Sequence, residues 1–319
     1  MTEPPRPPGA GRGADGEPAA TRLDVLVVGY ASIDFVWRAA SPPAPGRTSI
    51  LLGPVEPAPR YGGCGPSAAV ELARLGRRVE VITWLGDDGY GEAYLRHLRA
   101  SGVHTAGVQV ASGQASPRTM LIYDPAGSAT CLYHPSGSAE QTLDSTGLAL
   151  VRTAAALAIT VAPARLTEAV LEARPPGQLL AWNVKADADA LPLALRRQLL
   201  EFADCVCLNE DELGFLAEGL PEEDGGPLDW IRRRTNAIVV LTSGPRGCVV
   251  DWAGGRSAVS AERVEVDDPT GVGDAFFAAY LDAVLAHADP LGAARAASAH
   301  AARFLQAIQH GALPGGVAR

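Results

Sequence analysis

The chain has 319 residues, of which 47% are apolar, and its 36 acidic against 27 basic side chains give a formal net charge of −9. This composition supplies enough apolar side chains for a large buried core and shows no signature of overall disorder. The acidic balance, without a Lys/Arg cluster, disfavours nucleic acid and anionic membranes as partners, because like charges repel. A small molecule is therefore the expected partner.

The sequence contains no segment typical of membrane insertion or of a zinc site. No run reaches 18 apolar residues, and no basic region followed by an apolar one opens the chain, so a cytoplasmic location is expected. The five cysteines form no Cys-x-x-Cys pair and the six histidines no His-x-x-x-His pair. Reduced thiols and no zinc are therefore expected.

Strand and helix patterns alternate along most of the chain. Residues 1–22, rich in Pro, Gly and Ala, are predicted to form a disordered tail. Apolar runs predict buried strands and amphipathic patterns predict helices: strands at 23–29, 79–84, 155–161, 179–183, 205–208, 238–242 and 248–251, and helices at 65–75 and 89–100. This alternation predicts an α/β fold with a doubly wound, mostly parallel sheet flanked by helices, which binds ligands at the carboxyl ends of its strands.

A small β-strand lid is predicted from about residues 34–60 and 104–135, within a main domain of residues 23–319. Six prolines between residues 42 and 59 exclude a helix there, whereas residues 48–52 suit an edge strand. Residues 117–134 predict two short strands that turn at residues 125–127.

The most informative segment, residues 267–281, predicts a loop followed by a helix. Gly271 and Gly273 let the backbone approach a ligand, and a helix N-terminus offers free amides and a positive dipole end to an anion. Asp274, in the first turn, is placed to accept a proton from an attacking hydroxyl. The combination suggests phosphoryl transfer, although a capped helix after a tight turn explains the same residues. Because no Walker A motif or Gly-x-Gly-x-x-Gly after the first strand is present, phosphates must be held without a P-loop.

Several motifs, in order, resemble the ribokinase-like (PfkB) family of carbohydrate and nucleoside kinases. Residues 268–274 are similar to the C-terminal signature of that family, and residues 62–69 to its N-terminal signature. Residues 86–91, 209–212 and 242–247 match further motifs in the family's order. The resemblance covers nearly all of residues 23–315. It implies a ribokinase-like fold and an ATP-dependent transfer of phosphate to a hydroxyl of a small sugar or sugar-like acceptor.

The resemblance also implies roles for the residues around the phosphates. Asp274 corresponds to the general base, and Gly271, Val272 and Gly273 to the amides that bind the transferred phosphoryl. Asn209 and Glu212 match an Asn-x-x-Glu motif that holds Mg²⁺ through its waters, with a plain helix start as the alternative. A K⁺ ion is a further expectation, because Asp268 and Thr270 match positions that hold one in several members.

On the acceptor side, Asp34, just after the first strand, matches the acidic residue that binds substrate hydroxyls, with a plain turn residue as the alternative. Gly62 and Gly63 match the hinge of the lid, with a simple tight turn as the alternative. Ser67 and Asn183 complete the expected acceptor site. For the nucleotide, four residues resemble the family's nucleotide loop: Thr242, Ser243, Gly244 and Gly247. His300, on the last helix, lies where the family's adenine is expected, with a plain surface histidine as the alternative.

Two departures from the family leave the acceptor open. Ser67 replaces an asparagine that pairs with sugar hydroxyls, and of the pattern Asp-x-Asn-x-Arg at residues 181–185 only Asn183 is kept. Lys185, the only lysine, is either a point charge for phosphate or a surface position. A nucleoside kinase of adenosine-like specificity is the alternative, and a sugar- or nucleotide-binding protein without turnover is the alternative of another class.

The remaining aromatic residues and the lid carry two further expectations. Trp182, Tyr123, Tyr133 and Trp37 either stack on a nucleobase or, as expected for strand aromatics, pack. Because family members often pair through the lid, a homodimer is expected.

Overall fold

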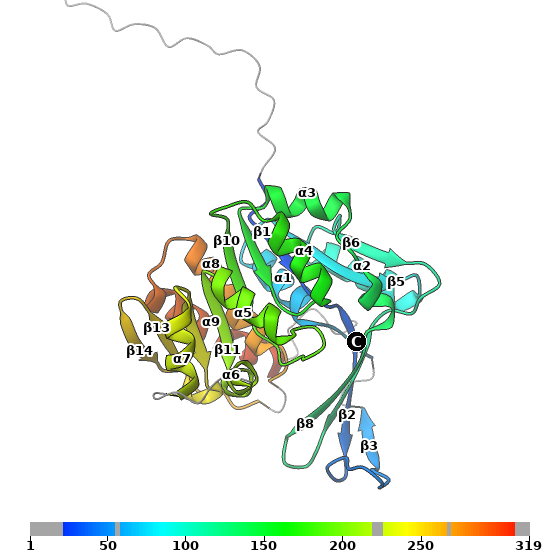
Figure 1. Ribbon diagram of the computed structural model, residues 1–319. Helices are drawn as coiled ribbons and strands as arrows, with labels where there is room; N and C mark the ends of the chain where they lie inside the picture. Colours follow the sequence, from blue (N-terminus) through cyan, green and yellow to red (C-terminus); the bar gives the residue numbers. More distant parts are fainter. Residues whose placement is uncertain (1–21, 55–57, 219–225, 267–268, 310–319) are drawn as a thin grey trace, which may run out of the picture.

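The protein is described by a computed structural model that covers residues 22–54, 58–218, 226–266 and 269–309. Its main body is built on a nine-stranded sheet in the order β14-β13-β12-β11-β10-β9-β1-β5-β6 (Figure 1). The strands are β1 (Val25–Val28), β5 (Val79–Gly86), β6 (Val108–Ala111), β9 (Ala156–Ile159), β10 (Leu179–Asn183), β11 (Cys205–Asn209), β12 (Ile238–Thr242), β13 (Cys248–Trp252) and β14 (Gly255–Val259). All pairs from β6 to β12 are parallel, and β13 and β14 add an antiparallel edge. The predicted mostly parallel sheet is confirmed.

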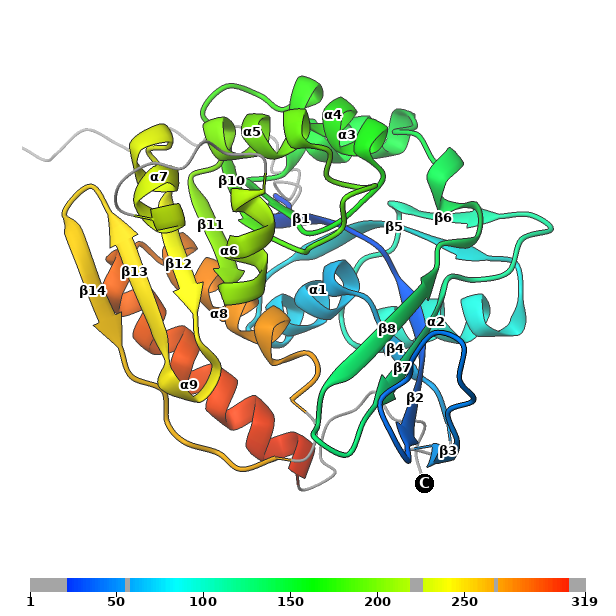
Figure 2. The same ribbon diagram turned by 60° about the horizontal axis from the view of Figure 1, so that its bottom comes forward.

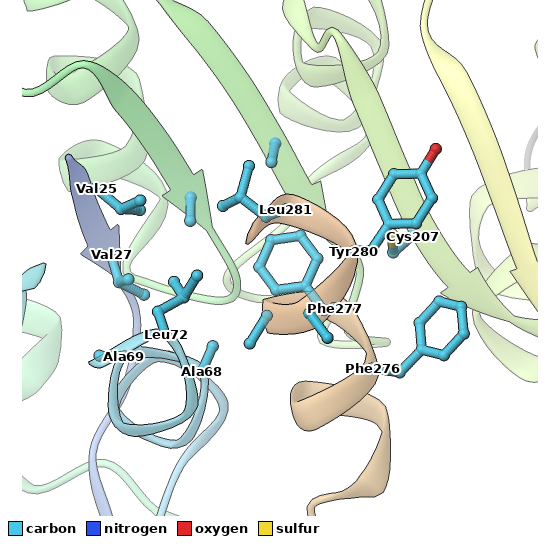
Figure 3. Close-up of a cluster of buried hydrophobic side chains, with 14 of the residues drawn as sticks. Val25, Val27, Ala68, Ala69, Leu72, Cys207, Phe276, Phe277, Tyr280 and Leu281 are labelled. Atoms are coloured by element: carbon cyan, nitrogen blue, oxygen red, sulfur yellow. The ribbon is translucent and has the colours of Figure 1, made fainter. Parts of the chain in front are cut away.

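Alternating side chains of β1 pack on opposite faces of this sheet, which explains its continuous apolar run. Val25 and Val27 join a cluster that includes residues of α1 (Cys64–Arg74), α2 (Gly89–Ala100), α8 (Val272–Leu285) and α9 (Pro290–Gln309). Figure 3 shows Leu72 of α1 and Phe277 of α8 facing these two valines. Leu26 and Val28 pack with residues of the helices on the other face: α3 (Ser145–Thr153), α4 (Ala164–Ala173), α5 (Leu193–Phe202), α6 (Glu210–Ala217) and α7 (Gly226–Arg234).

A second, smaller sheet extends from the main body, as Figures 1 and 2 show. Its order is β3-β2-β7-β8, and β4 pairs with β2. The strands are β2 (Ser32–Ala39), β3 (Leu51–Pro54), β4 (Arg60–Gly62), β7 (Arg118–Tyr123) and β8 (Ala129–His134). The hairpin of β7 and β8 turns at the predicted residues 125–127. The edge strand starts at Leu51, so the prediction of residues 48–52 was about three residues early.

The structure also bears on the cysteines, on membrane insertion and on the predicted tail. The five cysteines are free thiols, and Cys205 and Cys207 pack on one face of the sheet. In the described parts of the chain, no helix is long and apolar enough to cross a membrane. The predicted tail, except Arg22 at its end, and Asp268 lie outside the described residues.

Candidate active site

Three segments far apart in the sequence place charged and polar groups around Asp274. Asn183, the last residue of β10, donates from Nδ2 to Oδ1 of Asp274 at 3.1 Å. Lys185 Nζ lies 3.7 Å from the same oxygen and 3.5 Å from Oε1 of Glu212 in α6. The structure therefore brings together four residues predicted from three separate motifs, and Lys185 lies between two carboxylates.

Opposing effects act on the ionisation of Asp274. Burial raises the pKa of Asp274, and the Lys185 ammonium, the Asn183 amide and the Cys64 thiol oppose that rise. Burial alone would lower the pKa of Lys185, but the acidic groups around it raise the value above its usual range. Lys185 is therefore protonated and favours ionisation of Asp274.

The turn before α8 has a conformation that requires glycine. Gly271, the N-cap of α8, has a φ of 86°, in the left-handed region. The Val272 amide donates to the Pro269 carbonyl at 3.1 Å, so this amide is engaged within the turn. Among the described residues, the amides of Gly271 and Gly273 donate no backbone hydrogen bond, and amides at the start of a helix are donors of the kind that binds an anion.

Asp34 lies in β2 of the small sheet, not in a turn after the first strand. Its Oδ1 is buried and has no hydrogen-bond partner within the described part of the chain. Burial raises the pKa of Asp34 to about 6, against the lowering effect of hydrogen bonds from Ser32 and Thr119. An unsatisfied buried oxygen is costly, and a hydroxyl donor from a ligand would satisfy it.

Gly62 and Gly63 permit the close approach of this carboxylate and of the chain after β1. A Cβ at Gly62 would lie 1.8 Å from Asp34 Oδ2. Gly63 has a φ of 93°, and a Cβ there would lie 2.2 Å from the Tyr30 carbonyl oxygen. Ser67 lies one turn further along, in α1, with its amide bonded to the Gly63 carbonyl at 3.0 Å.

Asn209 and Glu212 form a capping box at the start of α6. The Glu212 amide donates to Asn209 Oδ1 and the Asn209 amide to Glu212 Oε2, both at 2.8 Å. The plain helix start left open in the sequence is therefore present, while Oε1 of Glu212 faces Lys185. Among the described residues, no group of three or more His, Cys, Asp or Glu could hold a metal ion. This donor set fits a hydrated cation held through water better than one ligated directly.

The predicted nucleotide loop follows β12 and lies beside α6. Thr242 donates to the Leu208 carbonyl at 3.2 Å, and Ser243 donates to Glu210 at 3.1 Å. Gly247 has a φ of 94°, and a Cβ there would lie 2.0 Å from the Val259 carbonyl oxygen. Gly244 also has a positive φ, of 54°. These contacts hold the loop at the carboxyl end of β12.

His300 and Thr270 have partners that the sequence did not indicate. His300 Nε2 lies 3.0 Å from Glu71 Oε2 of α1, which ties the last helix to α1. The Thr270 hydroxyl is 2.6 Å from the hydroxyl of Tyr123 in the small sheet. Cys64, beside Asp274, was also missed, although its place between the motif glycines could have drawn attention to it. Trp182 is fully buried in the core, so the expected packing role is confirmed.

Comparison with known proteins decides the family. The family model described as pfkB family carbohydrate kinase matches residues 22–312. The chain belongs to the pfkB family. This pfkB-family chain is therefore a phosphotransferase, and it carries the site above on the family's ribokinase-like fold.

The relatives of this pfkB-family kinase act on sugars or nucleosides. It is 27% identical over 281 residues to fructokinase-1 of Zea mays, covering 84% of each chain. A ribokinase of Cryptococcus neoformans in complex with ADP has a TM-score of 0.75 at 21% identity, covering 89% of this chain and 94% of the other. A nucleoside kinase of Burkholderia thailandensis in complex with inosine has the same TM-score and identity, covering 88% and 89%. At these identities the solved structures establish the shared fold.

Proposed function

We propose that this kinase transfers the γ-phosphoryl of ATP to a hydroxyl of a small sugar or sugar-like acceptor, with Asp274 as general base. The observation that carries the proposal is the position of Asp274. Its buried carboxylate is held by Asn183, faces Lys185, and lies in the first turn of α8 beside the amides of Gly271 and Gly273, which donate no backbone hydrogen bond among the described residues. A proton acceptor and an anion-binding turn in one place suit phosphoryl transfer.

In the proposed reaction, the acceptor hydroxyl gives its proton to Asp274 while its oxygen attacks the γ-phosphorus. The bond from that phosphorus to the β-phosphate oxygen breaks, and ADP leaves. The amides of Gly271 and Gly273 stabilise the charge on the transferred group, and Lys185 keeps Asp274 ionised until the proton arrives. Mg²⁺, when bound, neutralises phosphate charge, and Asn209 and Glu212 would hold it through its waters.

The other proposed contacts concern the nucleotide and a second cation. Thr242, Ser243, Gly244 and Gly247 supply the nucleotide loop. His300, whose ring is held by its contact with Glu71, is proposed to pack against the adenine. A K⁺ site beside Thr270 stays a prediction of the resemblance.

Asp34 supports a polyhydroxyl acceptor, because its unsatisfied Oδ1 is suited to accept a hydroxyl hydrogen bond. The names of the fructokinase relatives favour a sugar. One observation favours a nucleoside as the second candidate. The rings of Tyr30 and Tyr133 lie 5.2 Å apart, and such aromatic surface suits a flat base.

A homodimer through the outer face of the small sheet is part of the proposal. That face has an open groove of about 530 Å³, lined by apolar residues that include Phe35, Trp37, Met120 and Leu132. Leu132 is 57% exposed, and Ile50, just before the edge strand β3, and Leu52, within it, are 64% and 69% exposed. A second copy would cover apolar surface that a monomer leaves in water. A cytoplasmic location stays a prediction of the sequence.

The test is ADP release from ATP and Mg²⁺ across D-fructose, D-ribose, sugar acids, inosine and adenosine, with the phosphorylated acceptor identified by mass spectrometry. We expect acceptor-dependent ADP release with one sugar far ahead of the nucleosides. Faster turnover of inosine or adenosine would transfer the assignment to the second candidate. ADP release without a phosphorylated acceptor, or none at all, would contradict the proposed kinase reaction on these acceptor classes.

A further inference from the structure

The hairpin of β7 and β8 extends from the acceptor end of the small sheet to the loop that leads into α8. In Figure 2 the tip of this hairpin lies near that loop. Tyr123 is the last residue of β7, and its hydroxyl is 2.6 Å from that of Thr270. Thr270 directly precedes Gly271, the N-cap of α8. Side chains 147 residues apart therefore join the small sheet to the anion-binding turn.

The same strand also contacts the proposed acceptor site. Thr119 and Tyr123 are four residues apart on β7, and side chains at this spacing point to one face of a strand. The Thr119 hydroxyl is 2.5 Å from that of Ser32, and it also hydrogen-bonds Asp34. One strand thus reaches the acceptor carboxylate near its start and the anion-binding turn at its end, roughly 13 Å apart.

The turn that follows Tyr123 is held by its own hydrogen bonds. Asp124 Oδ1 accepts from the amides of Ala126 and Ser128 at 2.8 and 2.9 Å. The Gly127 amide donates to the Asp124 carbonyl at 3.0 Å. Because these bonds make the tip a defined turn, the Tyr123 phenol follows the position of the whole hairpin.

We propose that Tyr123 is a positioning residue that couples closure of the lid to the geometry of the anion-binding turn. The inference rests on the proposed function, in which Gly271 and Gly273 bind the transferred group. With the lid closed, Tyr123 holds Thr270 and thereby the backbone at Gly271. With the lid open, the turn loses this restraint, which disfavours transfer to water when no acceptor is enclosed.

The test is a double-mutant cycle of Tyr123→Phe and Thr270→Val, read first by hydrogen–deuterium exchange of the ligand-free protein. Exchange is followed in residues 118–134 and 269–275, so the readout needs no known acceptor. Thr270→Ser keeps the hydroxyl and serves as the rescue variant. Tyr90→Phe is the matched control, because Tyr90 packs against Phe35 and Arg118 instead of Thr270.

We expect each single variant and the double variant to speed exchange in both segments by the same factor, roughly three- to ten-fold. Thr270→Ser and Tyr90→Phe should match the wild type. With D-fructose or inosine, whichever turns over, kcat/KM for the acceptor should fall by a similar factor in Tyr123→Phe. Additive effects in the cycle, or unchanged exchange, would overturn the coupling even if the enzyme is a kinase. Coupled exchange without turnover on any acceptor would instead contradict the proposed function and leave the coupling standing.

Discussion

Asp34 is a buried carboxyl group whose ionisation destabilises the folded protein. Its pKa is raised by burial from an ordinary 3.8 to about 6. The contribution of protonated Asp34 to the free energy of unfolding is fully present below about pH 4 and is lost as the pH rises through about 6. At pH 8 the ionised group therefore destabilises the ligand-free protein.

Asp34→Asn should raise the free energy of unfolding at pH 8 by up to about 3 kcal/mol and have little effect at pH 4. The same variant should lose acceptor binding, because an amide replaces the proposed hydroxyl acceptor. Urea denaturation at the two pH values measures the first effect. If the variant were no more stable than the wild type at pH 8, the unfavourable ionisation inferred for Asp34 would be wrong.

Lys185 is expected to set the pH at which Asp274 becomes a usable base. Because the ammonium lowers the pKa of Asp274, Lys185→Met should raise that pKa and move the acid limb of the kcat/KM profile to higher pH. Lys185→Arg, which keeps the charge, should leave the limb near its wild-type position. If Lys185→Met lowered the plateau of the kcat/KM profile but left its acid limb at the wild-type pH, Lys185 would act on phosphate alone.

At the scale of single residues, the sequence predicted most members of the proposed site but few of the contacts between them. The motifs indicated that Asn183, Glu212 and Asp274 follow strands or open helices, so they were expected at one edge of the sheet. The ion pairs of Lys185 depend on side-chain reach across three elements, which spacing in one chain does not encode. The bond between Tyr123 and Thr270 depends on how the small sheet packs against the main body, which no local pattern specifies.

At the scale of elements, the start of α6 combines a helix cap with a proposed cation contact. Asn209→Ala should lower the free energy of unfolding by roughly 0.5–2 kcal/mol, whereas Asn209→Ser should keep the cap. If the Asn209 amide holds the waters of Mg²⁺, both variants should need more Mg²⁺ for half-maximal rate. If Asn209→Ser needed no more Mg²⁺ than the wild type, Asn209 would serve only as the helix cap.

The central strands were predictable because both of their faces are buried. The run of β1 reads as four consecutive apolar residues, and each is fully buried. β2 was missed because the sheet to which it belongs has one face toward the candidate site and one toward solvent. Its sequence therefore mixes Asp34 with apolar residues and gives no continuous run.

For the whole molecule, the outer face of the small sheet determines the expected assembly. We predict that Leu132→Asp converts a dimer into a monomer, because a charge would be buried in the groove that a second copy covers. Light scattering after size exclusion measures the mass. Val110→Asp is the matched control, since Val110 is 48% exposed on β6, outside the small sheet. A wild-type protein with the mass of one chain would contradict the dimer.

The architecture places the proposed chemistry where parallel sheets of this kind bind ligands. β1 continues to β5 in one direction, whereas β9, β10 and β11 follow in the other. Asn183 and Asn209 lie at the carboxyl ends of β10 and β11, and α8 presents Asp274 to the same edge. The central claim of the account is the role of Asp274 at that edge.

That claim is tested most directly by the single-turnover rate of Asp274→Asn with saturating ATP, Mg²⁺ and the best acceptor, beside direct measurement of ATP binding. We predict a loss in rate of roughly 10²–10⁴-fold, with ATP affinity and fold unchanged. A variant that transfers the phosphoryl group at a rate near that of the wild type would contradict Asp274 as the base.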